Sequence, residues 1–330
     1  MRLFREYCVS ALILMGLAFG PGPGDLQGQS LSEAASSCAS LASPSQQAWC
    51  EWALLGVQAA QGAVGLAVSG GTDLPGSAST LGWRTKGSPR YGISLRGLLV
   101  SAPMPSPNGT ELSPSDDVSA ELPAVHISGT VGVFDGFFVG PTVGGVGSLD
   151  LTLSGQWVRT PGDAGFNENL WSWGGGVRVG ILRESFSLPG ISLSGFYRTV
   201  GSTSLWGRQN GFPAESDFDL AVTSFRGVIG KDLWGIGFLA GTGWERYSGV
   251  FDVAVDDPEG MGNSAGLVGE MDSDRPLFFL GASMTFLALQ LSGEAGWAPG
   301  FESDLPRARN ADFDPSAKSF FGALALRLTF

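Results

Sequence analysis

Residues 319–330 read Ser-Phe-Phe-Gly-Ala-Leu-Ala-Leu-Arg-Leu-Thr-Phe and alternate between two kinds of position. The first set, apolar apart from its glycine, is Phe320, Gly322, Leu324, Leu326, Leu328 and Phe330. The second set is Phe321, Ala323, Ala325, Arg327 and Thr329. A period of two residues is typical of a β-strand whose two faces meet different surroundings. The segment therefore predicts a strand with one apolar face and one mixed face.

The same alternation recurs along most of the chain. It is clean at residues 148–158 and 287–297, and weaker at residues 91–101, 124–134, 173–183, 190–198, 218–231, 233–247 and 277–286. A strand of about ten residues rises ~33 Å and, tilted by about 40°, spans an apolar band of about 25 Å. Strands in soluble sheets are shorter. The pattern predicts an all-β fold, a transmembrane antiparallel up-and-down β-barrel of about 10–12 strands.

The two faces of the predicted strands differ in chemistry. The polar face, predicted to line the lumen, contains Arg96, Asp150, Arg178, Arg198, Glu294 and Arg327. The apolar face carries Trp or Tyr near many strand ends, at Tyr91, Trp157, Trp173, Tyr197, Trp234, Trp244 and Trp297. A barrel in lipid has apolar residues outside and aromatic girdles at both interfaces. A soluble sandwich has its apolar residues inside, so strand length and aromatic placement favour the barrel.

The connections between these strands alternate in predicted length. Short ones fall at residues 135–142, 184–189, 232 and 287–288, and long ones at residues 102–123, 159–172, 199–217, 248–276 and 298–318. Tight periplasmic turns and long outer loops are typical of outer-membrane barrels. We therefore expect the short turns on the periplasmic side and all long loops outside the cell.

The N-terminus resembles a secretory signal. Residues 1–28 contain Arg2 and Arg5, an apolar run over residues 8–19, and a Gly/Pro-rich break. These are the parts of a signal peptide, and the apolar run is shorter than the ~20 residues of a membrane-spanning helix. Cleavage is expected between Ala18 and Ser30. The chain is thus predicted to be exported to the outer membrane of a Gram-negative-type bacterium.

Residues 29–70 are predicted to form a helical hairpin. Residues 31–42 are rich in Ala and Ser, a break follows at Pro44, and Ser45 can cap a second helix over residues 46–61. The hairpin is expected to plug the lumen of a barrel formed by residues 71–330. The alternative is that residues 48–71 add two strands, which would make twelve.

Two cysteines, Cys38 and Cys50, follow the predicted signal peptide. In an oxidising compartment we expect them to form a disulfide across the hairpin. Closing this loop would stabilise the fold by ~3 kcal/mol in the chain-entropy model. The alternative is a pair of free buried thiols.

Composition limits the chemistry. The chain has 330 residues with 51 glycines, one histidine, three cysteines and a net charge of −12. Nucleic-acid binding needs a basic face and is not expected. The counts of His and Cys argue against a metal centre of those residues, and no cofactor is expected. Any Ser-His mechanism must use His126, with Ser128 on the same strand face, so these two are the candidate catalytic residues of a distant hypothesis, a lipid-modifying enzyme. The main expectation is that the protein is not an enzyme.

The chain resembles known outer-membrane proteins at two places. Residues 319–330 look like the terminal strand of bacterial outer-membrane β-barrels, which ends in Phe and alternates before it. The resemblance implies an assembly signal, read by the barrel-insertion machinery, at Leu324, Leu326, Leu328 and Phe330. Residues 62–71 and 75–80 resemble the N-terminal hatch of the long-chain fatty-acid transporter family. The barrels of that family have fourteen strands.

These features support two main functional hypotheses. The first is passive binding and passage of small hydrophobic molecules through a plugged lumen. The second is a structural or adhesive barrel with a sealed lumen and functional surface loops. In both cases the outer surface is expected to contact outer-membrane lipids.

Overall fold

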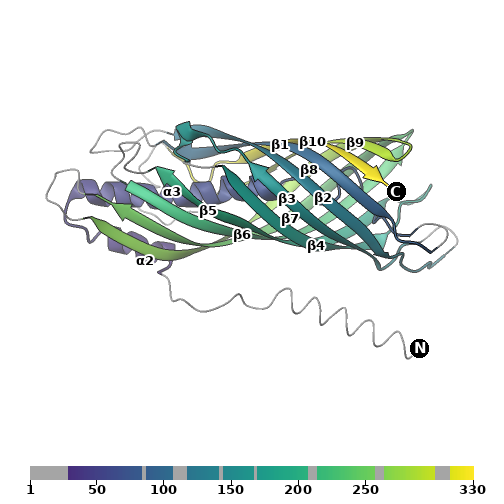
Figure 1. Cartoon of the computed structure of the whole chain (residues 1–330), viewed down its shortest axis with the longest axis horizontal. Coiled ribbons are helices and arrows are strands. Elements are labelled where there is room, and N and C mark those ends of the chain that lie inside the picture. The colour runs from purple at the N-terminus through teal and green to yellow at the C-terminus, as the bar shows by residue number, and fades with distance from the viewer. Residues whose placement is uncertain are drawn as a thin grey trace, which may run out of the picture.

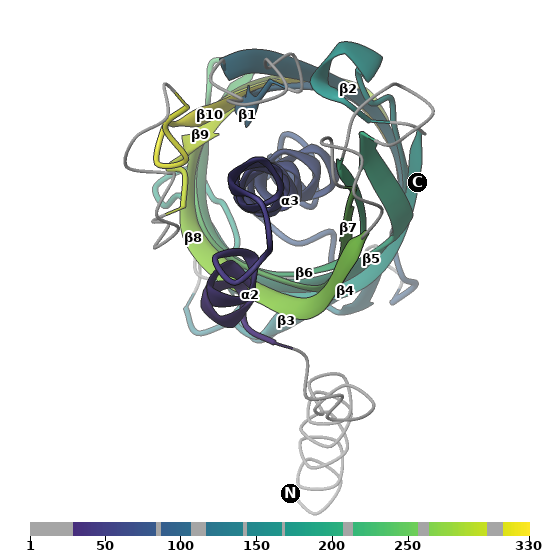
Figure 2. The same ribbon diagram turned by 90° about the vertical axis from the view of Figure 1, so that its left-hand side faces the viewer.

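The computed structural model describes residues 29–83, 87–106, 117–140, 144–166, 169–206, 214–256, 264–301 and 313–330. The predicted signal peptide, residues 1–28, lies outside the described residues. Ten antiparallel strands form a closed barrel around a helix (Figures 1 and 2). The strands are β1 (Tyr91–Pro105), β2 (Asp117–Phe134), β3 (Ser148–Val158), β4 (Leu170–Leu182), β5 (Gly190–Trp206), β6 (Ala214–Leu233), β7 (Ile236–Val255), β8 (Ala265–Phe286), β9 (Leu289–Ala298) and β10 (Ser319–Thr329).

Each strand pairs with its neighbours in the chain, and β1 pairs with β10 to close the barrel. At the seam, the Tyr91 N–H donates to the Phe330 carbonyl at 2.8 Å, and the Phe330 N–H donates to the Tyr91 carbonyl at 2.9 Å. Closure leaves no strand edge unpaired, as a sheet in lipid requires. The predicted up-and-down barrel is confirmed, with ten strands and not twelve.

The alternation seen in the sequence becomes an inside and an outside. In β1, Ser94 and Arg96 are buried, whereas the side chains of Ile93 and Leu95 are 52% and 50% exposed. Polar residues thus face the lumen and apolar residues face outward, the reverse of a soluble sandwich. An outer wall of this kind is stable only in contact with lipid, so the barrel is transmembrane.

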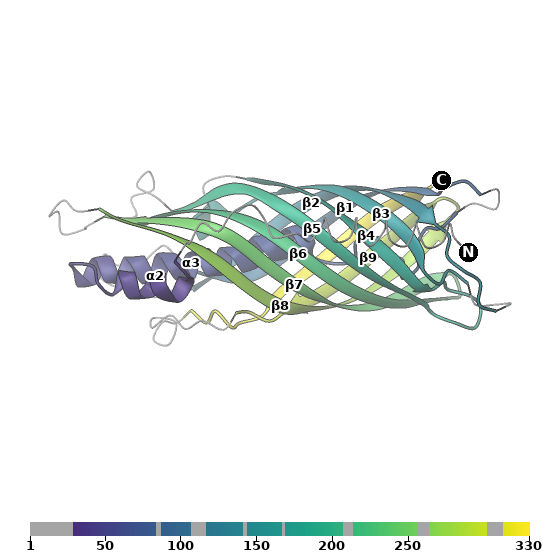
Figure 3. The same ribbon diagram turned by 90° about the horizontal axis from the view of Figure 1, so that it is seen from below.

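The two ends of the barrel differ. The tight turns at Trp234 and Leu287 lie at the same end as Phe330, which we take as the periplasmic end. At the opposite, outer end β6, β7 and β8 extend well beyond the short strands (Figure 3). The long loop predicted over residues 248–276 is wrong, because β7 continues to Val255 and β8 begins at Ala265. Alternation there involves acidic side chains, which suit a sheet projecting into water.

The predicted alternation of loop length is also too strict. The connection between β2 and β3 spans residues 135–147, longer than the predicted turn at residues 135–142. On the outer side, residues 199–206 extend β5, and residues 214–217 begin β6. The predicted loop over residues 199–217 is therefore shorter than expected.

The N-terminal helices are α2 (Leu31–Cys38) and α3 (Pro44–Ser69), and α3 lies within the barrel (Figure 2). The cap of α3 is Ser43, whose hydroxyl accepts from the Gln46 N–H at 3.2 Å, and not the predicted Ser45. Pro44 occupies the first turn, where its fixed φ and missing N–H cost nothing. The helix also continues past the predicted end at residue 61. It is long and apolar enough to cross a membrane, but 94% of its apolar window is buried inside the barrel.

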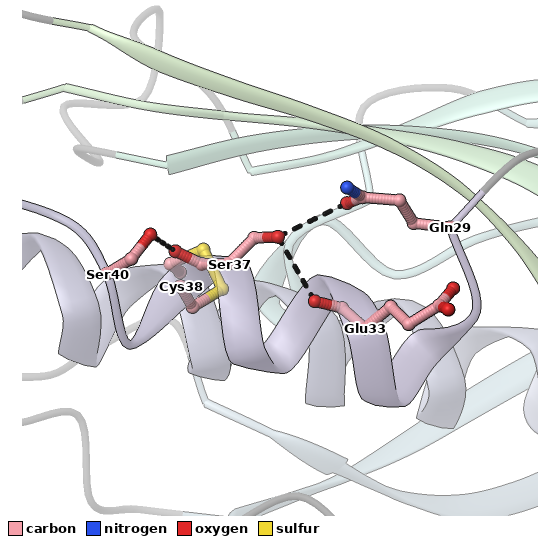
Figure 4. Close-up of a disulfide and its surroundings, with 6 residues drawn as sticks. Gln29, Glu33, Ser37, Cys38 and Ser40 are labelled. Atoms are coloured by element: carbon pink, nitrogen blue, oxygen red, sulfur yellow. Dashed lines mark hydrogen bonds between the residues drawn. A yellow bond between two sulfur atoms is a disulfide. The ribbon is translucent and has the colours of Figure 1, made fainter.

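A disulfide joins Cys38 to Cys50, as predicted, with a Cα–Cα distance of 5.5 Å. Figure 4 shows its surroundings on α2, where the Ser37 hydroxyl donates to the Glu33 carbonyl at 3.1 Å. The Ser40 hydroxyl donates to the Ser37 carbonyl at 2.7 Å. The bridge fixes α2 to the first turns of α3 at the outer end of the barrel.

Candidate functional site in the barrel lumen

The candidate site is the contact between the barrel wall and a lumenal plug, which we define as α3 together with residues 70–83. In the outer half of the lumen the packing between α3 and the wall is very close, and a few hydrogen bonds accompany it, such as the one from Arg275 of β8 to the Gly62 carbonyl at 2.7 Å. A Cβ placed on Gly56 would lie 2.6 Å from the Trp206 ring, and one on Gly65 would lie 2.0 Å from the Tyr247 ring. Only glycine lets the helix approach these rings at such distances.

Below the helix, the plug continues as an extended segment held by hydrogen bonds. Arg96 of β1 donates to the Gly70 carbonyl at 2.7 Å and also to the Thr72 carbonyl. Glu294 of β9 accepts from the Thr72 N–H at 2.8 Å and from the Thr72 hydroxyl at 2.5 Å. Gly71 has φ +84° beside Glu294, where an L side chain would be strained. Two strands on the wall therefore fix the first turn of the extended segment.

Asp73 is the centre of a buried ion cluster. Its carboxylate accepts from Arg198 at 2.8 Å, from Arg226 at 3.3 Å and from the Ser194 hydroxyl at 2.6 Å. Arg226 also donates to Glu245 at 2.8 Å and to the carbonyls of the plug. The side chains of Asp73, Arg198 and Arg226 are at most 6% exposed. Buried charges of this kind are stable only while they stay paired.

The extended segment remains bonded to the wall as it descends. Arg178 donates to the Ser77 carbonyl at 2.6 Å, and the Leu81 N–H donates to Asp150 at 2.8 Å. The hydroxyls of Thr80 and Ser148 lie 2.6 Å apart. The wall thus contacts the plug along the full depth of the lumen.

At the periplasmic end the plug is tied to the turn after β2. The Asp135 carboxylate accepts from the Trp83 N–H at 2.9 Å and from Arg183 at 2.5 Å. Partial burial alone would raise the pKa of Asp135, but the hydrogen bonds from Arg183 and Trp83 outweigh it and lower that pKa. The carboxylate form is therefore favoured at this contact.

A small cavity lies between the plug and strands β1, β2, β3 and β5. Its volume is about 20 Å³, room for about one water molecule. Asp73, His126 and Ser128 are among the residues that line it. His126 Nε2 lies 2.8 Å from the Ala67 carbonyl, and the Ser128 hydroxyl lies 2.6 Å from that of Ser94.

Each member of the candidate catalytic pair thus has a structural partner of its own. Nucleophilic catalysis needs the base within hydrogen-bond reach of the nucleophile.

Among the described residues, no group of three or more His, Cys, Asp or Glu side chains is placed to hold a metal ion.

The six residues predicted to face the lumen all point inward. Five of them hydrogen-bond the plug: Arg96, Asp150, Arg178, Arg198 and Glu294. The sixth, Arg327, has buried Nε and Nη1 atoms without a hydrogen-bond partner in the described part of the chain. The residues of the predicted assembly signal lie on the outer face of β10 and at the end of the chain, with Leu324 70% exposed.

Sequence reasoning missed several members of the ion cluster. Arg226 falls in a predicted strand, on the face opposite Phe225 and Ile229, so the alternation of this strand could have placed it on the polar face with the other arginines. Arg275, which donates to the Tyr247 hydroxyl at 3.0 Å and is linked through it to Glu245, falls in a segment predicted as an outer loop. Asp73 sits in the irregular part of the plug, where no periodic signal indicates which way a side chain points.

These features define an outer-membrane-type β-barrel whose lumen is filled by its own N-terminal segment. The sequence matches no protein-family model and no curated protein. Among solved structures, the chain is similar to the outer membrane protease OmpT from Escherichia coli, at 11% identity over 77% of this chain and 100% of that one, with a TM-score of 0.39.

Two further solved structures have similar folds. The translocator domain of the autotransporter NalP from Neisseria meningitidis has 12% identity over 82% of this chain and 95% of that one, with a TM-score of 0.37. A Pseudomonas aeruginosa FadL homologue has 10% identity over 83% and 97%, with a TM-score of 0.27.

Proposed function

We propose that the protein is a sealed outer-membrane barrel whose working surface is its outer end. The observation that carries the proposal is the continuous contact of the plug with the wall, from the Gly56–Trp206 packing to the Trp83–Asp135 hydrogen bond. A lumen filled in this way is a structural core rather than a channel. The role that remains is structural or adhesive, through the surface that the barrel presents outside.

The outer end is a built surface. The Glu270 N–H of β8 donates to the Gln29 carbonyl at 2.9 Å, which fastens the start of the hairpin to the extended sheet. The Trp52 indole N–H donates to the Ser106 carbonyl at 2.9 Å, just beyond the end of β1. With the disulfide, these contacts hold α2 and the start of α3 as part of the outer surface.

The competing hypothesis is passage of small hydrophobic molecules, which requires the plug to move. Displacing it would uncover the buried charges of the wall. In the described chain these are five arginines, Arg96, Arg178, Arg198, Arg226 and Arg275, and three acids, Asp150, Glu245 and Glu294. An uncovered lumen would thus be polar with an excess of positive charge, which suits anions better than hydrophobic cargo.

The lipid-modifying hypothesis is weaker still. His126 and Ser128 face a cavity of about 20 Å³ on the lumenal side of the wall, whereas lipid chains contact the opposite face. We also propose that Leu324, Leu326, Leu328 and Phe330 are read by the barrel-insertion machinery, because the outer face of β10 leaves them accessible. Outer-membrane lipids are the proposed partner of the whole outer wall.

Conductance in planar bilayers tests the sealed-lumen proposal. We expect no conductance from the wild type, and an anion-selective conductance from a variant that lacks residues 31–82. A heat-modifiable gel shift would verify that the variant still forms a barrel. Steady ion passage through the wild type, or uptake of a hydrophobic dye that depends on it, would contradict the proposal and favour the passage hypothesis.

A further inference from the structure

A groove of about 1100 Å³ lies on the lipid-facing side of strands β2 to β5. Aromatic residues form its sides: Trp157, Trp171, Trp173 and Tyr197. The groove reaches the outer ends of β3 and β4, where Val158 pairs with Leu170. It therefore lies in the half of the wall that faces the outer leaflet.

Three glycines lie among the residues that line the groove, and only one of them, Gly129, is left uncovered by a neighbouring side chain. Gly129 and Gly175 flank Leu153 in register, and Gly155 pairs with Ile127 and Trp173 in the next row. The Trp173 ring leans over Gly155, whose Cβ would lie 2.8 Å from it. At Gly129 a Cβ would have no atom within 4 Å, so this part of the floor is open.

The surroundings of the groove indicate its occupant. Leu153, Trp171 and Trp173 are 75%, 60% and 66% exposed, and they continue the lipid-facing wall without a break. A depression in such a wall meets lipid hydrocarbon, and a fixed aromatic surface holds a chain better than the fluid bilayer around it.

A cation follows the residues that line the outer end of the groove. Arg159 follows β3 two residues after Trp157 and is exposed. The backbone N–H of Arg159 donates to the Pro123 carbonyl at 2.9 Å. This bond continues the strand pairing and keeps the Arg159 side chain on the same face as Trp157. An exposed arginine just beyond the end of a lipid-facing strand is suited to lipid headgroups, whose phosphates it binds through paired N–H donors.

We propose that the groove binds one acyl chain of a phosphate-bearing lipid, with Arg159 at the phosphate. The binding site is on the wall and does not depend on whether the lumen is sealed. It differs from general lipid contact in that one molecule is retained when the surrounding lipid is removed.

Native mass spectrometry of the folded protein in detergent with added phosphatidylglycerol tests the proposal. Gly129→Leu fills the open floor, and Gly322→Leu is its matched control, because Gly322 is also lipid-facing with no atom within 4 Å of a Cβ. We expect one retained lipid in the wild type and in Gly322→Leu. In Gly129→Leu we expect roughly tenfold lower occupancy, the loss that corresponds to about two buried CH₂ groups.

A second variant keeps the test decisive if Gly129→Leu does not fold. Arg159→Gln should lower the occupancy of phosphatidylglycerol and leave that of diacylglycerol with the same chains unchanged. Equal lipid loss in Gly129→Leu and Gly322→Leu, or no retained lipid in the wild type, would overturn the proposal. Equal effects of Arg159→Gln on both lipids would overturn the assignment of the phosphate.

Discussion

In the outer half of the lumen, glycines of α3 pack against aromatic rings of the wall. In the inner half, residues 70–83 have no regular secondary structure and are held by hydrogen bonds and ion pairs with charged side chains of the wall. The first contact is steric: a Cβ on Gly65 would lie 2.0 Å from Tyr247. The second is electrostatic: the Asp73 carboxylate accepts from Arg198 and Arg226. It is the carboxylate that the plug supplies to these two buried arginines.

The difference shows that two physical effects hold the plug in the barrel, close packing of α3 and buried charge pairing of residues 70–83. A close-packed contact does not tolerate added atoms, because neighbours have nowhere to move. A buried ion cluster does not tolerate removal of a partner, because the remaining charge keeps its desolvation cost. Substitutions that add volume should therefore act on α3, and those that remove charge should act on the extended segment.

The largest effect is expected from Asp73→Ala. It leaves Arg198 and Arg226 buried without their shared carboxylate, which we expect to cost about 3–5 kcal/mol of unfolding free energy. Urea unfolding in detergent, followed by the heat-modifiable gel shift, measures this. The control is Asp272→Asn, which breaks the ion pair of Asp272 with Arg246. The side chains of these two residues are 59% and 65% exposed, respectively.

Breaking that exposed pair should cost at most about 1 kcal/mol. Similar midpoints for Asp73→Ala and Asp272→Asn would mean that water hydrates the ion cluster. In that case the extended segment would not be held by buried charge, and the contrast with α3 would fail.

A smaller loss is expected from Gly65→Ala in α3. The added methyl group collides with the Tyr247 ring, and overpacking of this kind costs about 1–3 kcal/mol. The matched control is Gly97→Ala in β1, where no atom lies within 4 Å of a Cβ. The same urea titration should show a lower midpoint for Gly65→Ala only. Equal midpoints would show that the helix has room to shift, so that steric packing does not hold it.

Much of this architecture could be predicted from the sequence. A period of two predicts which residues share a face of a strand, and strand length and aromatic placement indicate that the polar face, with Arg96, Arg178 and Arg198, lines the lumen. The strand ends at Val255 and Ala265 were missed because the polarity of the alternation is reversed there: Phe251, Val253 and Met271 are buried, whereas Asp252, Glu270 and Asp272 are exposed. Hydropathy marks where a strand leaves the membrane, not where it ends.

The contacts of the plug were beyond sequence reasoning for another reason. Asp73 meets Arg198 and Arg226 across more than a hundred residues of chain, and its direction depends on how the extended segment enters the lumen. The wall residues come from periodic strands, whereas their partners in residues 70–83 do not. Of the ion cluster, Arg198 on the wall could therefore be predicted, but Asp73 and the pairing of the two could not.

The smallest effect is expected at the periplasmic end of the plug, and it depends on pH. The pKa of Asp135 is lowered below its ordinary value of 3.8, chiefly by hydrogen bonds from Arg183 and Trp83 that outweigh partial burial. The stabilisation is therefore fully present above pH 3.8 and is lost as the pH falls through the lowered pKa. Because the side chains of Asp135 and Arg183 are more than a quarter exposed, we expect at most about 1 kcal/mol from the pair.

Asp135→Asn should thus lower the urea midpoint slightly at neutral pH, and the difference from the wild type should vanish in acid. In an Arg183→Gln background the same substitution should cost less, since its main partner is gone. No such pH dependence is expected for Gly65→Ala, whose effect is steric. A difference between Asp135→Asn and the wild type that persists unchanged in acid would mean that the charge of Asp135 does not hold this end of the plug. Electrostatic contacts would then hold the extended segment only as far as the Leu81–Asp150 hydrogen bond.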